Sequence, residues 1–136
     1  MTNELLSLAR DVRDYPGFAF KYRMSVICLD TSLEYTIVGT TADERLLRCL
    51  DSNGGYFFIE MYRLVPNLVD AANGGILLEL LGKGIDVACP TGAQNIRLWW
   101  VYSHTDGTCP TEECGATLAE ACCRLAARKQ SWDGGL

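Results

Sequence analysis

The spacing of apolar residues changes near position 16, and this change constrains the fold more than any other feature of the chain. Residues 3–14 carry apolar side chains at helical spacing, whereas alternate residues are apolar from Phe18 to Cys28. The first pattern predicts an amphipathic helix that ends at Tyr15-Pro16-Gly17. The second predicts a β-strand, so the chain begins as a helix followed by a strand.

The rest of the 136-residue chain continues this mixture, and its 49% hydrophobic content is enough for one core. Turn residues at Asp30-Thr31-Ser32 predict an antiparallel hairpin over residues 18–40. Downstream we expect helices over 41–50, 66–81 and 116–129, strands over 56–63, 85–89 and 96–103, a loop over 104–115 and a frayed tail over 131–136. The prediction is a single α+β domain over residues 1–136, with a mostly antiparallel sheet of about five strands packed with about three to four helices.

Charge and targeting patterns narrow the class of protein. Twelve Lys and Arg against seventeen Asp and Glu give a formal net charge of −5, whereas nonspecific nucleic-acid binding requires a basic face. Residues 1–15 mix apolar and charged side chains, unlike a signal peptide, and no stretch approaches the roughly 20 apolar residues that span a bilayer. Seven cysteines, an odd number without a secretion signal, favour reduced thiols. We therefore expect an acidic cytoplasmic protein that binds neither nucleic acid nonspecifically nor a membrane.

Two groups of residues are candidates for binding a ligand or a partner. Lys21 and Arg23 lie on the polar face of the first predicted strand, beside Tyr35, and two cations there would suit a small phosphorylated ligand or an acidic partner. The alternative is a solvated face balanced by Glu34. Trp99 and Trp100 occupy opposite faces of one predicted strand, so one of them can belong to the core while the other contacts a partner.

The densest group of metal-ligating residues comprises His104, Cys109 and Cys114, which thiolate and imidazole chemistry would suit to zinc. Their spacing differs from that of a zinc finger, so reduced thiols are the alternative. The same loop could also hold a cysteine nucleophile, with His104 as its base and Asp106 orienting the ring. Cys122 shares a helical stripe with apolar residues and is expected to be a core thiol.

The second half of the chain resembles a known family. A strand ending in Tyr62, a helix containing Val69-Asp70-Ala71-Ala72 and two short strands lead into residues 117–126, TLAEACCRLA. This last string is similar to the closing helix of the phage ABA sandwich domain family, small proteins of tailed phages and prophages. The resemblance implies a layered α/β fold and a phage accessory setting, and it carries over no catalytic residues.

Two functional hypotheses follow. The first is a non-enzymatic phage or mobile-element accessory protein that binds a host protein in the host cytoplasm, as an inhibitor of a defence or regulatory factor, or sequesters a small nucleotide signal. Its acidic charge suits a basic partner surface, and the chain has neither a phosphate-binding glycine loop nor a convincing catalytic set. The second is a small zinc-binding or cysteine-dependent enzyme using His104, Cys109 and Cys114. In either case an exposed hairpin edge could pair into a homodimer.

Overall fold

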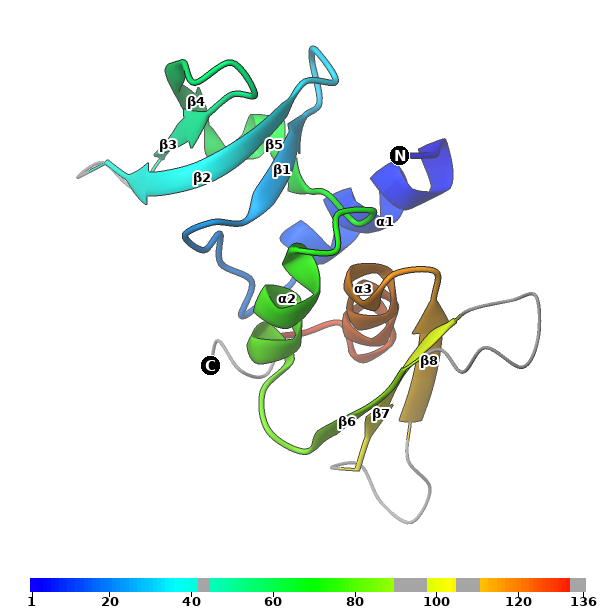
Figure 1. The fold of residues 1–136 in the computed structure, drawn as a ribbon. Helices are drawn as coiled ribbons and strands as arrows, with labels where there is room; N and C mark the ends of the chain where they lie inside the picture. Colours follow the sequence, from blue (N-terminus) through cyan, green and yellow to red (C-terminus); the bar gives the residue numbers. More distant parts are fainter. Residues whose placement is uncertain (42–44, 90–97, 105–110, 133–136) are drawn as a thin grey trace. The chain divides into compact units, whose positions relative to one another are not determined.

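The computed structural model describes residues 1–41, 45–89, 98–104 and 111–132. The chain forms two compact units, one of Met1–Ala19 with Leu68–Leu136 and one of Phe20–Asn67. The described part holds three α-helices and two antiparallel sheets, one of five strands and one of three (Figure 1). The α+β class is therefore confirmed, and the strands are divided between two sheets instead of one.

The unit of Phe20–Asn67 is a five-stranded antiparallel sheet with the order β4-β3-β2-β1-β5. Its strands are β1 (Ser25–Cys28), β2 (Glu34–Thr40), β3 (Leu46–Leu50), β4 (Tyr56–Glu60) and β5 (Leu64–Pro66), with a 3-10 helix over Met61–Arg63 between the last two. Side chains of one face form the core because they alternate with outward residues along each strand. The members of this core include Val26, Ile37, Leu47, Cys49 and Ile59.

The β1–β2 hairpin confirms the predicted hairpin, but the strand predicted from Phe18 begins only at Ser25. Lys21 to Met24 form a turn in which the Met24 N–H donates to the Lys21 carbonyl at 3.0 Å. Arg23 has a φ of 72°, which interrupts extended backbone. The alternation before Ser25 does not mark a buried strand face, because Tyr22 is exposed at 63%. Backbone bonds to β2 reach only as far as Arg23, whose N–H donates to the Ile37 carbonyl at 2.8 Å.

The helix predicted over 41–50 is wrong for Leu46–Leu50, which form β3 between β2 and β4; residues 42–44 lie outside the described residues. Leu47 and Cys49 are buried while Arg48 between them is exposed, a period of two that the helical interpretation overlooked. Strands on both sides satisfy the backbone groups of β3, and this nonlocal pairing outweighs the helix propensity of its leucines. The turn into β4 is held by Asp51, whose Oδ1 accepts N–H groups from Asn53 and Gly55 at 2.9 and 2.7 Å.

The other unit packs one helix on a three-stranded sheet with the order β6-β7-β8, and two further helices on that helix. Its elements are α1 (Asn3–Arg13), α2 (Asn73–Leu81), β6 (Ile85–Ala88), β7 (Trp99–Ser103), β8 (Thr111–Gly115) and α3 (Leu118–Lys129). The central helix is α3, which packs against α1, α2 and the sheet. Its buried residues include Cys122, Cys123 and Leu125, so the expected core role of Cys122 is confirmed.

Small residues allow α3 to lie close to its neighbours. A Cβ placed on Gly74 of α2 would lie 2.9 Å from the Leu118 Cβ, and one on Gly115 would lie 2.7 Å from the backbone nitrogen of Ala121. Thr117 caps α3 by accepting the Glu120 N–H at 3.0 Å and donates its hydroxyl to the Leu68 carbonyl. Packing in this unit thus depends on close backbone approach.

Three predictions for the second half of the chain need correction. The helix predicted from Pro66 begins at Asn73, because Leu64–Pro66 pair with β1 as an edge strand, where proline is tolerated. The loop predicted over 104–115 contains strand β8, whose partner is β7. Trp132, placed in the frayed tail, is completely buried; residues 133–136 lie outside the described part of the chain.

Candidate functional site

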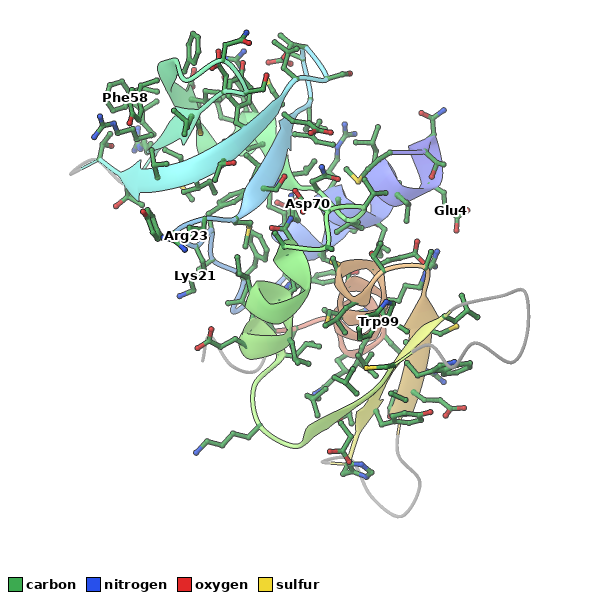
Figure 2. The ribbon with its side chains drawn as sticks, in the orientation of Figure 1. Glu4, Lys21, Arg23, Phe58, Asp70 and Trp99 are labelled. Atoms are coloured by element: carbon green, nitrogen blue, oxygen red, sulfur yellow. The ribbon has the colours of Figure 1, made fainter. Side chains whose placement is uncertain are left out.

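The three-stranded sheet has an inner face toward α3 and an opposite outer face. Gly115 approaches the start of α3, and the Glu113 carboxylate binds the Arg128 guanidinium of α3 at 3.1 Å, so these positions mark the inner face. Trp99 pairs with Gly115 across the sheet and shares this face (Figure 2). Because successive side chains alternate, Trp100 and Tyr102 lie on the outer face.

We call the outward residues of the three strands the outer sheet face; they are Asp86, Ala88, Trp100, Tyr102, Glu112 and Cys114. This face carries two aromatic rings between carboxylates. The Trp100 and Tyr102 rings stack with centroids 6.4 Å apart and an interplanar angle of 17°. The strand register places Asp86 on one side of Tyr102 and Glu112 on the other. Both rings are partly exposed, and both flanking residues are exposed. The face therefore combines π-systems and negative charge, which both attract cations.

His104 directly follows β7, and its imidazole contacts the carboxylate of Asp86 instead of that of the predicted Asp106. Its Nε2 lies 2.6 Å from Oδ2 of Asp86, and its backbone N–H donates to the Gly84 carbonyl at 3.1 Å. Asp86 is distant in sequence, and only the β6–β7 register brings it to His104. The predicted orienting residue, Asp106, lies outside the described residues.

Of the three predicted metal ligands, only His104 and Cys114 lie among the described residues. Cys114 lies on β8 at the outer sheet face, while Cys109 belongs to the residues that are not described. Across residues 1–41, 45–89, 98–104 and 111–132, no three His, Cys, Asp or Glu side chains gather in a group that could hold a metal ion. Zinc binding stays a prediction.

The predicted cationic site is not assembled as expected. Lys21 and Arg23 are exposed in the turn before β1, side by side in Figure 2, instead of on a strand face. The Arg23 guanidinium lies 5.5 Å from the Tyr22 ring centroid. Tyr35 instead contacts Phe57 of β4, with ring centroids 5.9 Å apart, and Glu34 pairs with Ile27 in the register. Binding of a phosphorylated ligand stays a prediction, because Lys21, Arg23 and Tyr35 do not share one strand face.

The described cysteines differ strongly in ionisation. Burial raises the pKa of Cys49 to about 11 and that of Cys122 to about 12, and it raises that of Cys123 well above 9.0. Burial also acts to raise the pKa of Cys28, but hydrogen bonds from Thr31 and from backbone N–H groups outweigh it and lower that pKa. The buried helix thiols are therefore protonated at neutral pH and poor nucleophiles.

A second exposed surface, formed by the aromatic residues of β4, was not predicted from the sequence. Tyr56, Phe57 and Phe58 follow one another on β4, and all three are exposed, at 59%, 46% and 62%. Three consecutive aromatics in a strand must place rings on both faces, and this was the available signal. The Arg48 guanidinium lies 4.4 Å from the Tyr56 ring centroid.

Comparison of the chain with family models, curated proteins and solved structures finds no match. The resemblance to the phage ABA sandwich domain family is therefore neither supported nor contradicted. Among the helices that the structure describes, none has the length and apolar character needed to cross a bilayer.

Proposed function

We propose that this chain is a non-enzymatic binding module whose outer sheet face binds an arginine- or lysine-bearing segment of a partner protein. The observation that carries the proposal is the Trp100–Tyr102 stack, with Tyr102 flanked across the sheet by Asp86 and Glu112. A cation over such rings gains from their negative π-faces, and a neighbouring carboxylate adds a charge-assisted hydrogen bond. Arginine suits this arrangement because it both stacks on rings and forms paired hydrogen bonds with carboxylates.

The charge of the whole chain supports the same class of partner. The formal net charge of −5 favours encounter with a basic surface and disfavours acidic ones. In the phage setting that the sequence resemblance suggests, the partner would be a host defence or regulatory protein in the host cytoplasm. Binding, and not turnover, would then inhibit that protein.

The proposal is tested by titrating the full chain with an arginine-rich peptide in a calorimeter. Replacing Tyr102 with leucine removes the π-face and should weaken binding about 2- to 30-fold, as expected for a cation–π contact. Glu112→Gln should also weaken binding. Glu79→Gln is the matched control, because Glu79 is an exposed carboxylate of the same unit on α2.

The comparison of the two glutamate variants separates local recognition from general attraction. If Glu112→Gln and Glu79→Gln weaken binding equally, the peptide responds only to net charge and the outer sheet face is not the site. If Tyr102→Leu binds as tightly as the unmodified chain, the aromatic part of the proposal is wrong. Circular dichroism of each variant confirms that the fold is retained.

A further inference from the structure

Strand β4 ends the five-stranded sheet of the Phe20–Asn67 unit, since the described strands place only β3 beside it. It consists of Tyr56–Glu60, and its three aromatic residues are exposed. Figure 2 shows Phe58 on this strand. Edge strands usually carry lysine, proline or a bulge that prevents pairing with another chain. The β3–β4 register is regular, and the sequence YFFIE contains neither lysine nor proline.

The backbone of β4 has hydrogen-bonding groups directed away from β3. The Asp51 N–H donates to the Gly55 carbonyl and the Met61 N–H to the Arg45 carbonyl, each at 2.9 Å. These two bonds involve Gly55 and Met61, the residues just before and just after β4. Because every second residue of an antiparallel pair bonds to the same neighbour, the odd-numbered residues of β4 bond to β3. Because the pattern alternates in an antiparallel pair, the N–H and C=O groups of Tyr56 and Phe58 and the N–H of Glu60 point toward the open edge, while the Glu60 carbonyl begins the 3-10 helix as its N-cap.

We propose that two copies of this chain pair through β4, antiparallel and with the twofold axis at Phe58. In this register Phe58 faces Phe58 of the second copy, and Tyr56 faces Glu60. The two Phe58 residues then form a hydrogen-bonded pair, and the Glu60 N–H of each copy donates to the Tyr56 carbonyl of the other. Shifting the register by two residues in either direction leaves Tyr56 or Glu60 of each copy without a facing residue on the other β4, so only the Phe58-centred register uses all three outward residues.

Local charge complementarity at this edge favours a second copy as its occupant, against the long-range repulsion between two chains of formal net charge −5, which salt screens. Arg48 lies opposite Phe58 in the β3–β4 register, on the same face as Tyr56, and its guanidinium is 4.4 Å from the Tyr56 ring centroid. Pairing Glu60 of one copy with Tyr56 of the other therefore brings that carboxylate near the second Arg48. The twofold axis repeats this pairing, and no like charges face each other across the seam.

Sedimentation equilibrium of the full chain under reducing conditions tests the proposal. We expect a reversible monomer–dimer equilibrium. Phe58→Lys places two ammonium groups at the axis and removes the aromatic pair, so the dissociation constant should rise about tenfold or more. Phe58→Pro should act similarly, because it deletes an N–H that points away from β3. Leu33→Lys is the matched control, since Leu33 is also exposed, at 56%, in the same unit.

A charge exchange tests the register itself. Arg48→Glu and Glu60→Arg should each weaken the dimer, and the double variant should recover most of the lost affinity, which a merely structural role for either residue would not produce. A chain that stays monomeric at all concentrations overturns the proposal and leaves the edge to an unrelated strand. A dimer that Phe58→Lys and Leu33→Lys affect equally also overturns it, because the contact must then lie elsewhere.

Discussion

Replacing Trp132 with alanine should destabilise the unit formed by Met1–Ala19 and Leu68–Leu136 by about 3–5 kcal/mol. The indole is completely buried, and its Nε1–H donates to the Val12 carbonyl at 2.8 Å. Its ring contacts Phe18, with centroids 5.8 Å apart. The backbone N–H of Trp132 also donates to the Pro16 carbonyl at 2.8 Å. The residue therefore holds the chain after α3 against the end of α1.

The magnitude follows from two losses. Truncating a buried aromatic side chain removes its apolar burial and leaves a cavity, which together cost about 3–5 kcal/mol. The Val12 carbonyl also loses its indole donor but still accepts the Tyr15 N–H at 3.3 Å, so this second loss is that of one hydrogen bond, about 0.5–1.5 kcal/mol, part of which the first range already includes. Against a typical total stability of about 5–15 kcal/mol, this is a large fraction.

Urea unfolding followed by far-UV circular dichroism measures the effect without relying on tryptophan fluorescence. With a slope of about 2 kcal/mol per molar urea, the midpoint should fall by about 1.5–2.5 M. Trp100→Ala is the matched control, since that indole is partly exposed and its loss should cost less. A loss below about 1 kcal/mol for Trp132→Ala would refute the reasoning, because exposed side chains give changes of that size.

An independent variant tests the same contact from the other side. Gly17 has a φ of 89°, and a Cβ built on it would lie 1.9 Å from the Trp132 carbonyl oxygen. Gly17→Ala should therefore also destabilise the chain, through backbone strain and overlap instead of a cavity. If Gly17→Ala is neutral, the chain after α3 does not lie where the structure places it.

Two further outcomes are expected. Thr117→Val removes the cap of α3 and its bond to the Leu68 carbonyl, so unfolding in urea should show a loss of about 1–2 kcal/mol, whereas an unchanged midpoint would contradict the capping role. Burial raises the pKa of Cys122 to about 12 from 9.0, so the unfolded chain ionises first and stability falls as pH rises above 9.0. Cys122→Ala should remove about 1.4 kcal/mol of this fall by about pH 10, measured as urea midpoints across the alkaline range; equal pH dependence in both proteins would contradict the raised pKa.

Local patterns predicted those elements whose side chains alternate between water and one core. The amphipathic helices α1 and α3 and the β1–β2 hairpin show this, since Val12, Ile37 and Leu125 are buried as their spacing indicated. On α3, residues four apart also pair, since the Glu120 carboxylate binds the Arg124 guanidinium at 3.3 Å. Where neighbours along the chain determine the environment, sequence spacing is sufficient information.

The predictions failed where a distant strand supplies the partner. Leu46–Leu50 and Thr111–Gly115 are strands because β2, β4 and β7 pair with them, although their local composition favours a helix and a loop. The candidate site behaves the same way. Trp100 could be chosen from the sequence as a partner-binding residue, but the positions of Asp86 and Glu112 beside Tyr102 follow only from the strand register.

The sequence by itself determined the α+β class, the acidic charge and the amphipathic faces, because these are properties of composition and of short periodicities. Only the tertiary structure decided the division of the strands into two sheets, the burial of Trp132 and the open edge of β4. Each of these depends on hydrogen bonds or packing between residues far apart in the chain. The free energy of such contacts depends on which segments meet, and that information is absent from any local stretch of sequence.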